Sequence, residues 1–206
     1  MDGKILPERT AKAIKELDCF AVCVQEVPTP KTSRFERALI SVGLQLTCVP
    51  SPTGEEGFGI GVISREAPLT KSTVDLGNGK SMIICTFETI TVASAHLDYK
   101  SGTKRVSQSR AICSAFNGIH CASVLGIDSN DLPTSDTVRI FDGGISGMFV
   151  IPKDSTESSL TTKSDSPTRE VDYLICNKDL PGIIVSRVLP DMVTSDHRPI
   201  ICDVPF

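Results

Sequence analysis

The 206-residue sequence contains no tryptophan, and only 5% of its residues are aromatic. Proteins that bind single-stranded nucleic acid usually stack the bases on aromatic side chains, so this composition argues mildly against a base-stacking nuclease channel. The chain also has no excess of positive charge, because its net charge is −4, and it offers no overall attraction to a polyanion. A phosphorylated ligand would have to be bound locally, by a metal ion or by a few Arg and Lys side chains.

The sequence has no long hydrophobic run and no leader-like start. Its longest apolar stretches, such as residues 82–85 and 122–127, are far shorter than the roughly 20 residues that span a bilayer. Residues 1–8 contain neither the basic nor the apolar region of a signal peptide. We therefore expect a chain without a transmembrane segment, located in the cytoplasm and present as a monomer.

The eight cysteines show no CxxC spacing, which argues against a zinc site or a disulfide framework. Most of them lie inside apolar runs, and we expect reduced thiols in the core at Cys19, Cys23, Cys85, Cys113, Cys121, Cys176 and Cys202. A hydrophobic content of 40% is enough to bury a substantial core, so residues 1–206 are expected to form a single domain.

The hydrophobic pattern predicts three helices, over residues 7–17, 33–43 and 104–117, and a short helix with a glycine-rich turn within 134–150. It predicts strands over residues 19–25, 44–49, 58–64, 81–87, 89–96, 121–127, 171–176, 183–189 and 200–204. The first of these strands is continuously apolar, as expected of a strand covered on both faces. Asn78-Gly79 is a hairpin signal, and residues 152–169 have the composition of an exposed loop. Runs of strands interrupted by helices indicate two packed, mostly antiparallel sheets with helices on the outer faces.

Acidic, amide and imidazole side chains stand at or near the ends of these predicted strands. They are Glu26, His96, Asp128, Asn130, Asp172, Asp196 and His197. The adjacent Asp196 and His197 place an acid and a base just before a predicted strand, a position where catalytic residues are often found. An isolated Asp-His pair is nevertheless more often part of an ordinary surface loop. Because oxygen ligands are hard, such a cluster favours Mg²⁺ or Mn²⁺ over zinc. Such an ion can neutralise charge on a phosphoryl group during in-line displacement.

Five short segments resemble the endonuclease/exonuclease/phosphatase superfamily of metal-dependent hydrolases, in the order of that family. They are QEV at 25–27, SAHL at 94–97, LGIDSN at 125–130, PTREVDYL at 167–174 and SDHRP at 195–199. Each segment is a weak signal alone, but the ordered set covers nearly the whole chain and is specific. The resemblance implies a four-layer α/β sandwich that hydrolyses a phosphodiester or a phosphomonoester.

The resemblance also implies roles for individual residues. Mg²⁺ or Mn²⁺ would be bound by Glu26, and Asp196 would belong to the metal site. Asp128 and Asn130 would orient the attacking water and the phosphate. His96 would donate a hydrogen bond to a phosphoryl oxygen in the transition state.

The remaining roles concern the last histidine and two arginines. His197 would act as a general base or a phosphate contact, with Asp172 fixing its tautomer. Arg105 and Arg169 would bind the substrate, although a loop arginine such as Arg169 is as often simply solvated.

One departure from the family concerns its first strand, which normally ends in an Asn of the form TWN or TYN. This sequence has no such strand, and residues 2–9 align with the segment that usually follows it. We expect a shortened gene model. A genuine loss would weaken metal binding and leave an unpaired sheet edge beside residues 20–25.

The leading hypothesis is a Mg²⁺-dependent phosphoesterase that acts on nucleic acid or on a small or lipid phosphodiester, by in-line attack of an activated water. The alternative is a degenerate family member that binds a phosphorylated partner without turnover, which the missing Asn strand would favour. A domain without any site would require all five segments to match by coincidence.

Overall fold

The computed structural model of the chain describes residues 7–28, 32–50, 58–142, 147–154, 158–177, 180, 184–190 and 195–204. Its helices are α1 (Pro7–Glu16), α2 (Thr32–Ser41), α3 (Gly102–Phe116) and α4 (Asp136–Asp142). Its strands are β1 (Ala21–Pro28), β2 (Gln45–Pro50), β3 (Phe58–Ser64), β4 (Thr70–Gly77), β5 (Lys80–Thr86), β6 (Thr91–His96), β7 (Ser123–Asp128), β8 (Met148–Val150), β9 (Asp172–Asn177), β10 (Ser186–Val188) and β11 (Ile200–Cys202). The predicted glycine-rich turn extends over residues 143–146, which lie outside the described residues.

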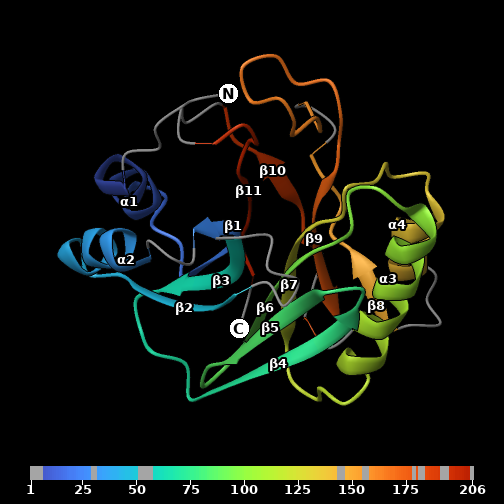
Figure 1. The fold of residues 1–206 in the computed structure, drawn as a ribbon, viewed down its shortest axis with the longest axis horizontal. Helices are drawn as coiled ribbons and strands as arrows, with labels where there is room; N and C mark the ends of the chain where they lie inside the picture. Colours follow the sequence, from blue (N-terminus) through green and yellow to red (C-terminus); the bar gives the residue numbers. More distant parts are fainter. Residues whose placement is uncertain are drawn as a thin grey trace.

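These elements form four layers (Figure 1). One sheet has the order β1-β3-β2, a second has the order β4-β5-β6-β7-β9-β8, and β10 pairs with β11. Helices α1 and α2 lie outside the first sheet, and α3 and α4 lie outside the six-stranded sheet (Figure 1). Among the described strands, every pair is antiparallel except β6 with β7. The predicted sandwich of two mostly antiparallel sheets is therefore confirmed.

The core is divided by the six-stranded sheet, because alternate residues of a strand face opposite sides. On β5, Met82 packs in the cluster beneath α3 and α4, whereas Ile83 packs in the cluster between the two sheets. A third cluster joins α1 and α2 to the first sheet, with Leu39 and Ile63 fully buried in it. The space between the sheets is thus filled with apolar side chains along most of its length.

Strand β4 was not among the strands predicted from the sequence. It is an edge strand whose residues Lys71, Ser72 and Thr73 are exposed, so it has no apolar run to reveal it. The turn that joins it to β5 was predicted. Asn78 and Gly79 both have positive φ, at 55° and 74°, as a tight hairpin turn requires.

Strand β1 differs from its prediction in extent and in burial. It continues to Pro28 through a β-bulge between Val24 and Val27, so Glu26 lies inside the strand and not after its end. Residues 21–25 are only half-buried, although the strand packs against apolar clusters on both of its faces, as predicted. The reason is that, among the described residues, β1 pairs only with β3 and is an edge strand.

The cysteines are all free thiols. Cys85, Cys113 and Cys176 are buried as predicted, but Cys121 is exposed at the start of the segment leading into β7. Its apolar neighbours in the sequence made it resemble a core position. No helix among the described residues is long and apolar enough to cross a membrane.

Candidate active site

Three of the predicted site residues stand in one row across the six-stranded sheet. His96 ends β6 and is paired in register with Asp128, which ends β7, and Asp128 is paired with Asp172, which begins β9. Because side chains of paired residues point to the same face of a sheet, the three side chains lie next to one another. The row therefore follows directly from the register of three neighbouring strands.

Strand β1 lies close against this sheet. At Gly126 on β7, an added Cβ would come within 2.5 Å of the Cβ of Cys23, so only glycine permits the approach. Gln25 Nε2 donates to Ser94 Oγ at 3.1 Å and to the carbonyl of Gly126 at 3.3 Å. Gln25, the first residue of the QEV segment, thus joins the two sheets. The next residue, Glu26, lies at the edge of the candidate site.

Glu26 occupies the bulge of β1 with a positive φ of 54° and an exposed side chain. It lines a cleft together with His96. Its negative charge is also one of the causes that raise the pKa of Asp128. The structure therefore places Glu26 close enough to Asp128 for their charges to interact, and its role as a metal ligand stays a prediction.

His197 is held in place by residues 161–164, which belong to the segment 152–169 that was predicted to be an exposed loop. The backbone N–H of Arg198 donates to the carbonyl of Thr161 at 2.7 Å, and Arg198 Nε donates to the carbonyl of Ser164 at 2.8 Å. Ser164 Oγ donates to the carbonyl of Ser195 at 2.8 Å. Thr161 is fully buried and Ser164 is 7% exposed, so the loop prediction was wrong for this part. Its Ser and Thr side chains are buried because backbone groups satisfy their hydrogen bonds.

His197 and Asp172 form a hydrogen-bonded pair. The distance from His197 Nδ1 to Asp172 is 2.9 Å for Oδ2 and 3.1 Å for Oδ1, so Nδ1–H donates to the carboxylate and Nε2 is left for a ligand. Burial lowers the pKa of the imidazole, but the hydrogen bond and charge of Asp172, with the charges of Asp128 and Asp196, outweigh it and raise the pKa to about 9. The ring is therefore protonated at neutral pH.

His96 has the opposite electrostatic environment. Burial, together with repulsion from Lys80 and His197, lowers its pKa to about 4, so the ring is neutral at pH 7. Its Nε2 lies 3.0 Å from Asn130 Nδ2 and 3.5 Å from Asp128 Oδ2. A neutral ring that accepts from the Asn130 amide at Nε2 carries its proton on Nδ1, which is then its remaining donor.

The loop after β7 is fixed by its own side chains. The backbone N–H of Asn130 donates to Asp128 Oδ1 at 2.9 Å, and Asn130 has a positive φ of 53°. Its side-chain amide also donates to the carbonyl of Leu97 at 3.2 Å. Asp128 and Asn130 therefore stay at fixed positions beside His96.

A buried lysine, Lys153, supports the Asp172 end of the row. It was not among the residues predicted from the sequence. Lys153 Nζ donates to Glu170 Oε1 at 2.7 Å and to the carbonyl of Asp172 at 2.8 Å, and it lies 4.6 Å from the centre of the Tyr173 ring. The side chain is only 8% exposed. Nothing in the sequence around Lys153 signals burial, because its partner Glu170 becomes a neighbour only through folding.

The chain matches no family model and no curated protein. It is similar in structure to an endonuclease/exonuclease/phosphatase from Bacteroides vulgatus, with a TM-score of 0.81 and 14% identity over 97% of this chain and 89% of that one. The chain has the endonuclease/exonuclease/phosphatase fold. It is also similar to the mannosyl-6-phosphatase Bt3783 of Bacteroides thetaiotaomicron, with a TM-score of 0.78 and 14% identity over 97% and 90% of the two chains. A third similar structure is D. rerio TDP2 with a single-strand DNA product, with a TM-score of 0.72 and 15% identity over 100% and 94%.

On this endonuclease/exonuclease/phosphatase fold, three other predicted residues are not part of the row. Arg105 is 13% exposed, donates from Nε to Asp131 at 2.9 Å, and so joins α3 to the loop after β7. Arg169 is exposed, with its backbone bonded to Thr162. Asp196 is exposed and its charge acts on His197. The substrate and metal roles of these residues stay predictions.

The donor set fits a hard divalent cation. Ligand atoms of Asp128, Asp172 and His197 all lie within 4.8 Å of one another. Burial, together with repulsion from Asp172 and Glu26, raises the pKa of Asp128 to about 7, so several carboxylates lie close together here and a cation would relieve their repulsion. Because the His197 ring is protonated and bonded to Asp172, the groups left to face a cation are carboxylates, those of Asp128 and Asp172 in this cluster with Glu26 and Asp196 nearby.

Proposed function

We propose that this protein is a Mg²⁺- or Mn²⁺-dependent phosphoesterase that hydrolyses a phosphodiester or a phosphomonoester. The observation that carries the proposal is the row of His96, Asp128 and Asp172, completed by His197 bonded to Asp172. A neutral imidazole and a protonated one on either side of a buried carboxylate suit phosphoryl transfer. Both rings are able to donate to phosphate oxygens while a carboxylate receives a proton.

The proton-handling residues have distinct roles in this proposal. Asp128, at the centre of the row, accepts the proton of the attacking water, and Asn130 orients the phosphate through its amide. Protonated His197 donates from Nε2 to a phosphoryl oxygen, while Asp172 fixes its tautomer. Because the pKa of His197 is raised to about 9, the phosphate contact is favoured over the general-base role at neutral pH. His96 donates from Nδ1.

The metal ion belongs beside this row. Glu26 and Asp196 are proposed to hold Mg²⁺ or Mn²⁺ next to the negative charge of Asp128. When bound, the ion neutralises charge on the phosphoryl group. Oxygen donors of this kind favour hard cations over zinc, which supports the choice of metal.

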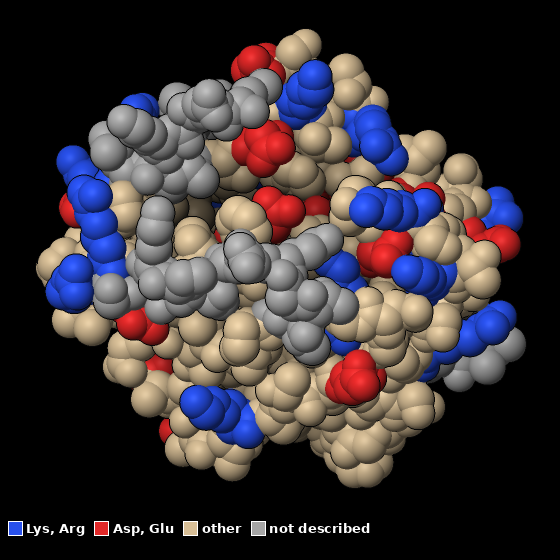
Figure 2. All heavy atoms as spheres, viewed as in Figure 1, with Lys and Arg blue, Asp and Glu red and all other residues tan. Residues whose placement is uncertain are grey.

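The substrate is a phosphoester, either nucleic acid or a small or lipid phosphodiester. Structural neighbours include a mannosyl-6-phosphatase and a protein bound to a single-strand DNA product, so the fold serves more than one substrate class. On the face drawn in Figure 2, Lys and Arg side chains of the described residues alternate with Asp and Glu instead of forming one basic surface. A short or small phosphoester suits this surface better than a long nucleic acid.

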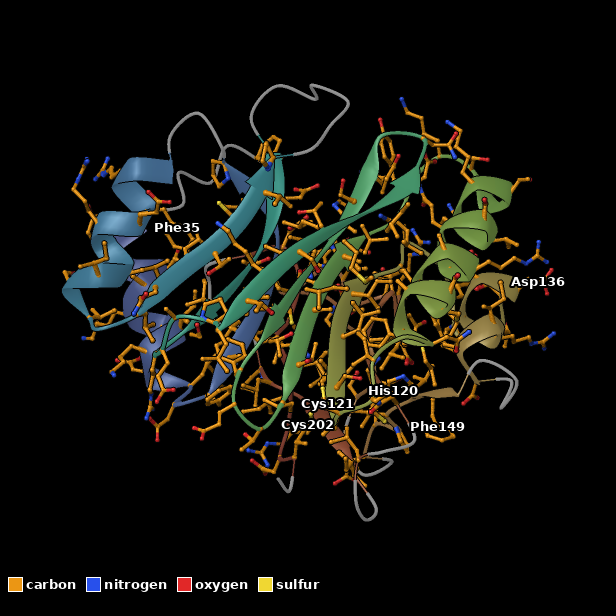
Figure 3. The ribbon with its side chains drawn as sticks, turned by 90° about the horizontal axis from the view of Figure 1, so that it is seen from below. Phe35, His120, Cys121, Asp136, Phe149 and Cys202 are labelled. Carbon is orange, nitrogen blue, oxygen red and sulfur yellow. The ribbon has the colours of Figure 1, made fainter. Side chains whose placement is uncertain are left out.

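The test compares hydrolysis of a panel of phosphodiesters and phosphomonoesters with Mg²⁺, with Mn²⁺ and with a chelator. Activity should require the metal and should fall by at least about 10³-fold in His197→Ala and in Asp128→Ala. His120→Ala is the matched control, because His120 is exposed at the joint between α3 and β7, away from the row (Figure 3). Chelator-resistant activity, or activity that survives both site substitutions, would refute the proposal. Binding of phosphorylated ligands without any turnover would instead support the alternative of a non-catalytic binder.

A further inference from the structure

A cleft opens beside the row, on the side of β1. It is formed by residues of five strands, and its lining consists of Glu26, Pro50, Phe58, Gly59, Ile60, Lys80, Ser81 and His96. His96 and Glu26 are shared with the candidate site, so a ligand whose phosphoryl group lies at the row extends its other substituent into this cleft. The cleft therefore meets the part of the substrate that does not react.

One part of the cleft is an apolar wall. Phe58, at the start of β3, is 47% exposed, and Pro50, at the end of β2, is also exposed, while Ile60 is 7% exposed. These side chains offer no hydrogen-bond donor or acceptor to a ligand. A flat ring lying against them gains contact area and stacking.

The other part of the cleft carries a cation. Lys80 begins β5, just after the turn at Asn78 and Gly79, and is half-buried. Its charge helps to lower the pKa of both His96 and Asp98, which places it within electrostatic range of the row. Among the described residues, no carboxylate lies within ion-pair distance of Lys80.

We propose that this cleft is a binding site for a single nucleotide unit, with the base against Phe58, Pro50 and Ile60 and an anionic phosphoester oxygen directed to Lys80. The inference rests on the proposed function and specifies its substrate class as a nucleotide ester or a nucleotide end. One exposed ring provides one stacking platform, which agrees with the low aromatic content of the chain. Stacking of a base on an aromatic side chain contributes about 1–3 kcal/mol.

The experiment compares two diesters with the same leaving group, thymidine 5′-(p-nitrophenyl phosphate) and methyl p-nitrophenyl phosphate. The wild-type chain should show a higher kcat/KM for the nucleoside ester, and Phe58→Ala should lower the ratio of the two kcat/KM values by about 5- to 100-fold. Phe58→Tyr should retain the ratio. Phe149→Ala is the matched control, because Phe149 is 40% exposed on β8, at one edge of the six-stranded sheet (Figure 3).

Calorimetric binding of thymidine 5′-monophosphate gives a second readout that needs no turnover. Phe58→Ala and Lys80→Met should each weaken this binding by about tenfold, whereas Lys71→Met, at the opposite end of the β4–β5 hairpin, should leave it unchanged. Hydrolysis of both diesters with a ratio that Phe58→Ala does not alter would overturn the nucleotide site and leave the phosphoesterase proposal intact. Nucleotide binding that depends on Phe58, without hydrolysis of either ester, would support the site and refute the enzyme. No binding of the monophosphate and no hydrolysis would overturn both.

Discussion

The two sides of the candidate site are built in different ways. On the six-stranded side, Asp128, His96 and Asp172 occupy one register row, and their side chains are 10%, 13% and 16% exposed. On the other side, Glu26 is exposed in a bulge of an edge strand, at a positive φ of 54°. The proposed proton acceptor, Asp128, thus sits on a paired and buried sheet, and the proposed metal ligand, Glu26, sits on a strained edge.

This difference indicates which side chains need a precisely fixed position. Proton transfer to Asp128 requires a fixed distance, which the strand register provides, and the proposed phosphate contact of His197 requires a fixed tautomer, which its bond to Asp172 provides. A metal ligand on an exposed strand edge is free to adjust to the ion and its substrate. The strained φ of Glu26 is the local cost of the bulge that places this residue beside the cleft.

The strongest test of the buried side is Asp172→Asn. The amide would donate to His197 Nδ1 in place of accepting from it, so the wrong tautomer would form, and hydrolysis should fall by about 10³–10⁴-fold. The pKa of His197 should fall from about 9 towards its ordinary value of 6.5, measured by NMR titration of labelled histidine. A variant with normal activity would show that the pair does not set the tautomer.

The same substitution should change the pH dependence of stability. Because folding raises the pKa of His197, the stabilisation that it provides is fully present below pH 6.5 and is lost as the pH rises through about 9. Asp172→Asn should therefore remove the loss of stability between these two pH values, measured by urea unfolding without metal. An unchanged profile would assign that loss to other groups.

The second test removes the support of the row with Lys153→Met. The change leaves Glu170 buried without its partner, so the free energy of unfolding should fall by about 3–5 kcal/mol. Lys153→Met combined with Glu170→Gln should recover much of this loss. Arg34→Met breaks the exposed ion pair with Glu8 and should cost less than about 1 kcal/mol. Equal effects of the two single substitutions would contradict the difference between buried and exposed support.

The third test strains a close contact between the two sheets. Gly126→Ala places a methyl group against Cys23, and overpacking of this kind costs about 1–3 kcal/mol. Gly102→Ala is the control, since an added Cβ there would come no nearer than 3.6 Å to the end of the flexible Arg105 side chain. The two melting temperatures measure the difference. If both variants melt alike, the sheets are able to move apart without loss.

The residues of the row could be selected from the sequence because each ends or begins an apolar strand. The sequence does not predict that His96, Asp128 and Asp172 are aligned, since register depends on pairing between distant strands. Lys153 and Lys80 were missed for a related reason. A lysine in a polar segment is normally solvated, and only folding brings Glu170 to Lys153 and the cleft to Lys80.

The errors about individual elements have the same origin. The segment around Thr161 and Ser164 has the composition of a loop, yet its backbone holds the His197 segment in place. Strand β4 was missed because an edge strand needs no apolar run. Composition predicts burial well where apolar side chains fill the core, and poorly where hydrogen bonds between segments satisfy polar groups.

The smallest expected effect concerns the exposed side and is tested with Glu26→Gly. Glycine accepts a positive φ without strain, so the free energy of unfolding should stay the same or rise by up to about 1 kcal/mol. Loss of the carboxylate should weaken Mn²⁺ binding by about tenfold, measured by electron paramagnetic resonance. Asn78→Gly, at a similar φ of 55° but in the β4–β5 turn, should leave Mn²⁺ binding unchanged. A variant of Glu26 that is destabilised and binds Mn²⁺ normally would mean that the bulge serves the fold and not the metal, so the contrast between the two sides would no longer hold.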